Sequence, residues 1–186
     1  DSPMALEALK HYSARVAELD AEMKPSQKDV STFATARFQT VNSPQQSKEL
    51  TASRRSAIVI SASGMATGGR VLHHMAAALP DPKNTVLFVG YQAAGTRGRA
   101  LVAGAPEVKI HGQVVPVRAR IAKIDSMSAH ADRGEILRWL GTFPSAPGRL
   151  MLVHGEPGPM DALKSTIVQR LSWTVHAPEH RERIII

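Results

Sequence analysis

The sequence predicts an α/β fold, because short apolar runs typical of buried strands alternate with segments whose apolar residues recur at helical spacing. Glycine-containing stretches directly follow two of the apolar runs, where an α/β fold places its strand-to-helix turns. The chain has 186 residues, of which 43% are hydrophobic. It can therefore bury a core in one domain or in two small ones.

Capping residues and prolines mark where helices begin and end. Ser2 followed by Pro3 predicts a helix that runs to about Lys24, where Pro25 ends it. The polar residues 25–53 are predicted to form a loop, with a short irregular element near 33–38 and a surface helix end or linker over 49–55. Apolar spacing predicts further helices over residues 70–79, 95–102, 132–141 and 159–171, the third of them opened by a capping box of Asp132 and Glu135.

Strands are predicted between these helices from apolar runs and from alternation. The His111-Gly112 pair has the chemistry of a tight hairpin turn between residues 108–110 and 113–115. The other predicted strands cover residues 57–60, 85–89, 117–124, 150–153, 173–176 and 183–186, and the first, second and fourth of these should be buried.

Composition narrows the class of protein. The formal net charge is +7, which favours an anionic partner, with nucleic acid ahead of an acidic membrane; the alternative is a solvated surface that happens to be basic. The absence of cysteine excludes disulfides, thiolate zinc sites and a thiolate nucleophile, and a cytoplasmic location is expected. No run of about 18 apolar residues is present, so we expect no membrane span. The opening Asp1-Ser2-Pro3-Met4 is neither an initiator start nor a signal peptide, so we expect a piece of a longer polypeptide.

A glycine-rich loop follows the first predicted strand and precedes a predicted helix. Backbone N–H groups in such a loop converge on one point, where the helix dipole adds positive potential, and this arrangement suits a phosphate. The loop matches neither the Walker nor the dinucleotide-binding pattern, and a tight turn that needs glycine is the alternative interpretation. Its candidate phosphate-binding residues are Ser61, Ser63, Gly64, Met65, Thr67, Gly68, Gly69 and Arg70.

Two histidines stand at positions where an α/β fold places chemistry. His154 follows a predicted strand and precedes Gly155, with Glu156 able to orient its ring. His130 lies between Ser128 and Asp132, but a Ser-His-Asp trio within five residues cannot align as a catalytic triad. The adjacent His73 and His74 face different directions on a helix and cannot form a metal pair. Two histidines are too few for a complete metal site.

The order and spacing of several motifs resemble the carboxy-terminal portion of β-CASP nucleases, a branch of the metallo-β-lactamase fold. The resemblance covers nearly the whole chain, and it is only loose over residues 25–53. The matching stretches are Asp1–Ala5, Ser63-Gly64-Met65 with Gly68-Gly69, Asp81–Asn84, Val89–Gln92 with Gly95-Thr96, Val115–Arg118, Ser128–Asp132 and Val153–Glu156.

This resemblance implies a fold, a reaction and residue roles. Residues 1–124 would be the remainder of a parallel-sheet β-CASP cap, and residues 125–186 the closing strands and helices of a metallo-β-lactamase αββα fold. The implied reaction is hydrolysis of RNA phosphodiester bonds at two zinc ions. By the same resemblance, His154 is a zinc ligand, His130 protonates the leaving oxygen, and loops that include Tyr91, Gln92, Gly95 and Thr96 line the RNA cleft.

The amino-terminal metallo-β-lactamase half, with the other zinc ligands and the acidic partner of His130, is missing from this sequence. We therefore expect a portion that is inactive alone and binds no zinc tightly. The alternative is a non-catalytic basic RNA-binding module with vestigial motif residues. A self-contained serine hydrolase is disfavoured, because no G-x-S-x-G elbow is present. The choice between endonuclease and 5′ exonuclease stays open, as does the oligomeric state, for which a homodimer is one candidate.

Overall fold

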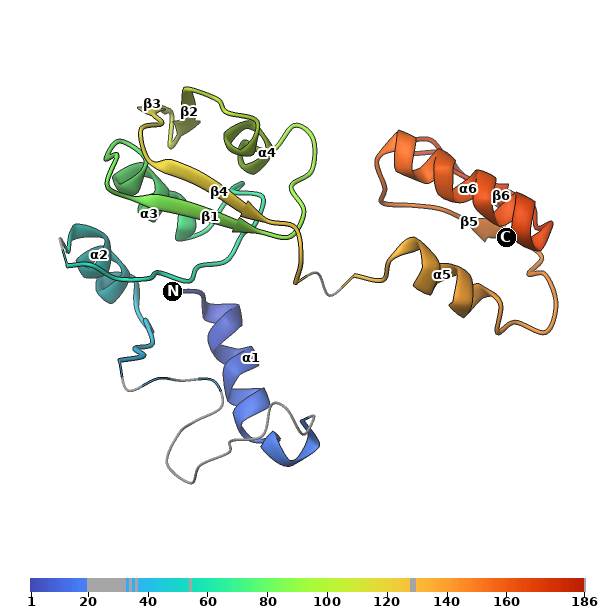
Figure 1. Cartoon of the computed structure of the whole chain (residues 1–186), viewed down its shortest axis with the longest axis horizontal. Helices are drawn as coiled ribbons and strands as arrows, with labels where there is room; N and C mark the ends of the chain where they lie inside the picture. Colours follow the sequence, from blue (N-terminus) through green and yellow to red (C-terminus); the bar gives the residue numbers. More distant parts are fainter. Residues whose placement is uncertain (20–32, 34, 36, 54, 128–129, 186) are drawn as a thin grey trace. The chain divides into compact units, whose positions relative to one another are not determined.

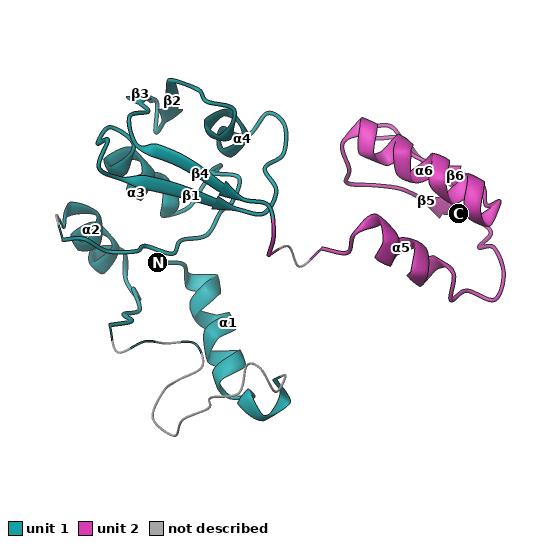
Figure 2. Cartoon of the chain, in the orientation of Figure 1, with its two compact units in different colours: residues 1–125 teal, residues 126–186 magenta. Residues whose placement is uncertain are grey.

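The computed structural model describes residues 1–19, 33, 35, 37–53, 55–127 and 130–185 (Figure 1). The chain divides into two compact units, Asp1–Asp125 and Ser126–Ile186 (Figure 2). Each unit contains strands and helices around its own cluster of buried apolar side chains, so the predicted α/β class is confirmed.

A pair of parallel strands forms the centre of the first unit. Strand β1 (Thr85–Val89) pairs with β4 (Arg120–Ile124), from Thr85 opposite Arg120 to Val89 opposite Ile124. Helices α3 (Val71–Ala78) and α4 (Arg97–Val102) contribute apolar side chains to the hydrophobic core around this strand pair. The fully or nearly fully buried side chains there include Leu72, Met75, Leu79, Phe88, Leu101 and Ile110.

The predicted hairpin is confirmed. Strands β2 (Glu107–Ile110) and β3 (Gln113–Pro116) pair in antiparallel fashion. Their turn places His111 at φ 48° and Gly112 at φ 82°, the two positive values that a type I′ turn requires.

The amino-terminal part of the first unit departs from the prediction. Helix α1 (Pro3–Ser13) is followed by a 3₁₀ turn over Val16–Glu18, so the helix ends before the predicted Lys24. Its cap is as expected, with Ser2 Oγ accepting a hydrogen bond from the backbone N–H of Ala5. No residue of α1 is buried, and a helix without packed neighbours gains little from further turns.

A second helix, α2 (Pro44–Ala52), lies where the sequence was expected to form a loop. Ser43 and Gln46 make a capping box, and Pro44 is the first helical residue. This is the same serine-proline signal that begins α1, and the polar composition of residues 25–53 obscured it. The irregular element expected near 33–38 falls partly outside the described residues.

The predicted strand over residues 57–60 is wrong. These residues belong to no strand, and Ile58 and Ile60 are 94% and 72% exposed. An apolar run indicates that a segment tends to be buried, but a strand also needs a partner in a ladder, and the described residues provide none for 57–60. Strand β4 also begins later than expected, because the N–H groups of Val117, Arg118 and Ala119 are bonded to the carbonyl groups of Pro106 and Leu79 instead.

The second unit contains two helices and a short parallel strand pair. Helix α5 (Arg133–Leu140) opens with the predicted Asp132–Glu135 capping box and ends at Gly141. Helix α6 (Pro157–Leu171) packs its Ile167 against Leu140 and Val175 in the core of this unit. Strands β5 (Leu150–Met151) and β6 (Val175–His176) are shorter than predicted, and residues 183–185 form no strand.

Among the described residues, no helix is both long enough and apolar enough to cross a membrane.

Gly98 fixes how closely two parts of the first unit approach. A Cβ atom on Gly98 would lie 2.9 Å from the carbonyl oxygen of Gly64 and 3.1 Å from the carbonyl carbon of Met65. Gly98→Ala should therefore lower the free energy of unfolding of this unit by about 1–3 kcal/mol through overpacking. Helix propensity alone predicts stabilisation by about 1 kcal/mol, so the sign separates the two effects. Denaturant unfolding followed by far-UV circular dichroism measures it.

Gly68→Ala is the matched control, because a Cβ at Gly68 meets nothing within 4 Å. Its stability should stay within about 0.5 kcal/mol of the unchanged chain. Both tryptophans, Trp139 and Trp173, lie in the second unit, so tryptophan fluorescence should report one unaltered transition in both variants. Stabilisation by Gly98→Ala would show that the close contact with Gly64 is absent.

Candidate functional site

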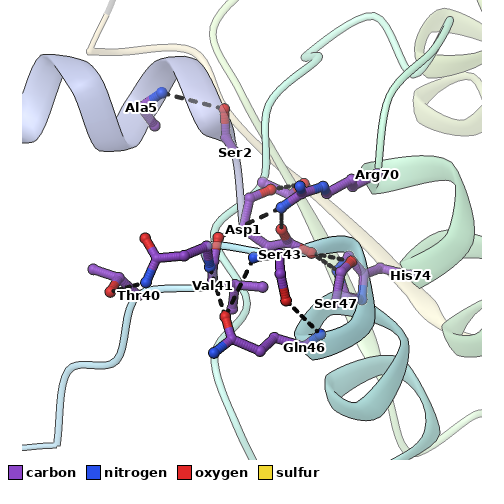
Figure 3. A network of polar contacts seen from close by, with 12 residues as sticks. Asp1, Ser2, Ala5, Thr40, Val41, Ser43, Gln46, Ser47, Arg70 and His74 are labelled. Carbon is purple, nitrogen blue, oxygen red and sulfur yellow. Dashed lines mark hydrogen bonds and ion pairs between the residues drawn. The ribbon is translucent and has the colours of Figure 1, made fainter.

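The glycine-rich loop, residues 61–69, is held at both ends by Asp1. The Asp1 side chain is fully buried, and its carboxylate accepts hydrogen bonds from Arg70 at 2.7 Å and from Ser47 at 2.5 Å. His74 Nε2 lies 2.8 Å from the same carboxylate (Figure 3). At the other end of the loop, Ser61 Oγ donates to the backbone carbonyl of Asp1 at 2.8 Å. Removing one partner of a buried ion pair of this kind costs about 3–5 kcal/mol.

The exposed part of the loop offers unpaired donors. Within the part of the chain that the structure describes, the backbone N–H groups of Gly64, Met65, Thr67, Gly68 and Gly69 donate to no other protein group. Two residues of the loop have left-handed or otherwise unusual backbone angles, with φ 121° at Ser63 and φ 50° at Ala66. Free N–H groups in a strained, glycine-rich turn form a concave surface suited to an anion.

The second predicted loop, Gly90 to Thr96, contacts the first. The backbone N–H of Ala93 lies 3.1 Å from the sulfur of Met65, and the N–H of Gly98 donates to the carbonyl of Met65 at 2.9 Å. Thr96 caps α4 through its Oγ1, which accepts from the N–H of Arg99 and donates to the carbonyl of Ala93. The structure therefore brings together the two loops that the sequence assigned to one cleft.

Two predicted members of the second loop differ in exposure. Tyr91 is 51% exposed, whereas Gln92 is 1% exposed and its Nε2 donates to the carbonyl of Gly90. The Oε1 of Gln92 is buried and accepts no hydrogen bond from the described residues. Gly95, at φ 77°, adopts a turn conformation that favours glycine.

Sequence reasoning assigned the cation beside the loop to Arg70, and the structure assigns it to Arg97. The charge of Arg70 is matched by the Asp1 carboxylate. Arg97 instead donates to the backbone carbonyls of Lys109 and Ala66, the latter within the loop, and no carboxylate among the described residues pairs with it. Arg97 and Gly98 were missed as site residues, although both follow directly on the Gly95-Thr96 motif.

The two motif histidines belong to the second unit. His130 is exposed and precedes Asp132, whose Oδ1 accepts from the N–H of Glu135 at 2.8 Å, so this carboxylate caps α5. His154 is exposed, follows β5, and has φ 67°. Ser128 lies outside the described residues. Glu156 stands at the N-cap position of α6, where its side chain makes no capping hydrogen bond.

Backbone strain coincides with the candidate segments. Ser63, Ala66 and His154 lie within these segments and have positive φ, as has Met127, three residues before His130. Gly155, the residue after His154, is closely packed against Met160. A Cβ atom on Gly155 would lie 2.5 Å from Cγ of Met160. Such angles cost energy and cluster at functional sites, so they support a functional role for these turns.

A complete zinc site does not form from the residues described. Among them, no group of three or more His, Asp or Glu side chains is placed to hold a metal ion. Structural and catalytic zinc sites take three or four protein ligands. The side chains in the described part of the chain therefore do not fit a complete zinc centre.

Comparison with known proteins places the chain in a family. Residues 1–101 match the Beta-Casp domain, and residues 114–178 match the Zn-dependent metallo-hydrolase RNA specificity domain. The chain belongs to the β-CASP family. This confirms the resemblance on which the motif assignments rest.

Similar β-CASP proteins are considerably longer than this chain. A ribonuclease of Thermus thermophilus is 36% identical over 91% of the chain, which covers 39% of that relative. The transcription termination factor FttA of Pyrococcus horikoshii is 32% identical over 82% of the chain and 24% of its own length. An RNase J-like protein of Methanocaldococcus jannaschii is 40% identical over 53% of the chain and 23% of its own length. The chain thus spans about two fifths or less of these relatives.

Because His74 contacts the buried carboxylate of Asp1, it makes the stability of the first unit depend on pH. Burial and, second, the ammonium group of Asp1 lower the pKa of His74 from its usual value of 6.5. Below pH 6.5 the unfolded chain takes up a proton that the folded chain resists, so the free energy of unfolding should fall as the pH is lowered through this value. It should be insensitive to His74 at higher pH, where both states are neutral.

Urea unfolding of the chain between pH 5 and pH 8 measures this dependence. His74→Gln should flatten the decline on the acid side, because glutamine does not titrate and can still donate to Asp1. A stability that instead rises on acidification in the unchanged chain would mean that the Asp1 carboxylate raises the pKa of His74.

Proposed function

We propose that this chain is the carboxy-terminal portion of a zinc-dependent ribonuclease that hydrolyses RNA phosphodiester bonds and is inactive alone. The observation that carries the proposal is β-CASP family membership, together with the absence, among the described residues, of a group of three or more side chains that could hold a metal ion. The relatives named for ribonuclease and transcription-termination activity support RNA as the substrate. The rest of the site would lie on an amino-terminal metallo-β-lactamase half.

The two units would have different functions, RNA binding in the first and catalysis in the second. The first unit would bind the RNA backbone through the free N–H groups of the glycine-rich loop, beside the charge of Arg97. This unit carries sixteen Lys and Arg against ten Asp and Glu, so it attracts phosphates, whereas the second carries seven against six. Tyr91 would offer its exposed ring to a base, since single-stranded RNA bases stack on aromatic side chains.

The second unit would contribute the reacting groups. His154 would be a zinc ligand, with Glu156 orienting its ring, and His130 would donate a proton to the leaving oxygen. Zinc held in part by His154 would supply an activated hydroxide and would stabilise the negative charge that develops on the phosphate oxygens.

The isolated chain should bind zinc weakly. One zinc ligand without its partners gives little affinity, so metal analysis after dialysis should find far less than one equivalent of zinc per chain. Stoichiometric zinc that resists dialysis would contradict the assignment of the remaining ligands to other polypeptide.

A chimaera tests the two histidine roles. In it, this chain replaces the matching segment of the Thermus ribonuclease, which supplies the amino-terminal half. His154→Ala should lose zinc and RNA cleavage together, because the substitution removes a ligand. His130→Ala should retain zinc while cleavage slows by about 10²–10⁴-fold, the usual contribution of a general acid. Zinc content and cleavage rate are measured on the same preparations.

Loss of zinc in the His130→Ala chimaera would contradict its role as proton donor. Arg99→Ala, on the exposed side of α4 and outside the proposed machinery, is the matched control and should retain both properties. A chimaera that binds RNA and zinc but never cleaves would favour the alternative of a non-catalytic RNA-binding module.

A further inference from the structure

We propose that Asp1 is a positioning residue whose buried carboxylate and backbone carbonyl together hold the glycine-rich loop in its RNA-binding conformation. The inference rests on the proposed RNA-binding function of that loop. It adds a residue that neither motif spacing nor local pattern places near the loop, because Asp1 lies about sixty residues before it in the sequence.

Asp1 holds the two ends of the loop at one point. Ser61, the first loop residue, donates its hydroxyl proton to the Asp1 carbonyl at 2.8 Å. Arg70, which follows the last loop residue, donates to Asp1 Oδ1 at 2.7 Å. The span between these anchors contains the free N–H groups of Gly64, Met65 and Thr67 to Gly69. Their direction therefore depends on contacts that converge on a single residue.

The remaining contacts of Asp1 fix the carboxylate itself. Ser47 from α2 donates to Oδ2, and His74 from α3 lies 2.8 Å from the same oxygen (Figure 3). With both oxygens engaged and the side chain fully buried, the carboxylate has one orientation. Arg70, which is only 21% exposed, is thereby held away from solvent and from any ligand of the loop.

The substitution Asp1→Asn distinguishes a positioning role of Asp1 from a purely electrostatic effect of its charge on RNA binding. Asparagine keeps the shape of aspartate and one accepting oxygen, but its amide nitrogen is a donor. It therefore cannot accept from Arg70 at one position and from Ser47 and His74 at the other, as the carboxylate does. The substitution also removes one negative charge and releases Arg70, and on electrostatic grounds alone both effects strengthen RNA binding. If Asp1 positions the loop, RNA binding weakens instead, so the direction of the change decides between the two.

The experiment measures the dissociation constant of the 186-residue chain for a fluorescently labelled single-stranded oligoribonucleotide, by anisotropy at several salt concentrations. Asp1→Asn should raise the dissociation constant about tenfold. The slope of the logarithm of affinity against the logarithm of salt concentration should fall by an amount equivalent to about one phosphate contact. Glu107→Gln is the matched control, since it also removes one negative charge from the first unit, but at an exposed position of β2 outside the Asp1 contacts. It should change binding less than about twofold, within the range of a neutral substitution.

Hydrogen exchange without RNA provides a second, independent measurement. The bonded amides that report on the loop are those of Ala66, which donates to the Ser63 carbonyl, and Gly98, which donates to the Met65 carbonyl. Both should exchange faster in Asp1→Asn, whereas the amides of the β2–β3 hairpin should keep their rates. If Asp1→Asn does not fold, Ser61→Ala replaces it, because this variant loses only the anchor at the start of the loop. It should show faster exchange at Ala66, the bonded amide of this part of the loop, and unchanged exchange there would overturn the proposal.

The outcomes distinguish this inference from the function on which it rests. If the unchanged chain binds no RNA, the proposed function is overturned. If it binds RNA and Asp1→Asn binds equally well or more tightly, with unchanged exchange in the loop, the positioning role alone is overturned.

Discussion

The buried carboxylate of Asp1 is the interaction on which the arrangement of the first unit depends. An ionised carboxylate removed from water is costly unless it is paired and fully hydrogen-bonded, so its partners must all be present at once. Those partners come from two separate segments: Ser47 lies on α2, while Arg70 is the N-cap residue of α3 and His74 lies within α3. Because α3 also supplies Leu72 and Met75 to the core, the polar cluster joins the amino-terminal helices to the strand pair and fixes where the glycine-rich loop begins and ends.

Features of the fold that depend on a few neighbouring residues were predictable from the sequence. The Ser2 cap of α1, the Asp132–Glu135 box of α5 and the His111-Gly112 turn all follow from local hydrogen bonding and backbone preference. The errors over strands concern pairing between distant segments, whereas the capping box of α2 is a local signal that the polar composition around it obscured. Residues 57–60 have the composition of a strand, yet strand formation requires a ladder partner, and composition contains no information about whether one is present.

The candidate site likewise has features that the sequence identifies and features that only the tertiary fold shows. Motif spacing identified both loops and both histidines, and the structure brings the two loops into contact through Met65, Ala93 and Gly98. What spacing could not reveal is which charges remain uncompensated. Arg70 and Arg97 both border the loop in sequence, but a carboxylate almost seventy residues away matches the first, while the second points at backbone carbonyls of Ala66 and Lys109. Only the tertiary fold distinguishes them.

The distribution of charge and of strained backbone supports the proposed division of RNA binding and catalysis between the two units. The excess positive charge belongs almost entirely to the first unit, which lacks both motif histidines, while the nearly neutral second unit contains His130 and His154. A long-range attraction for phosphate is useful wherever RNA first binds, whereas a proton donor needs a surrounding field that does not suppress its charged form. In the proposed assignment of roles, RNA affinity and chemistry would lie on separate units, and the strained turn at His154, with φ 67°, would serve ligation alone.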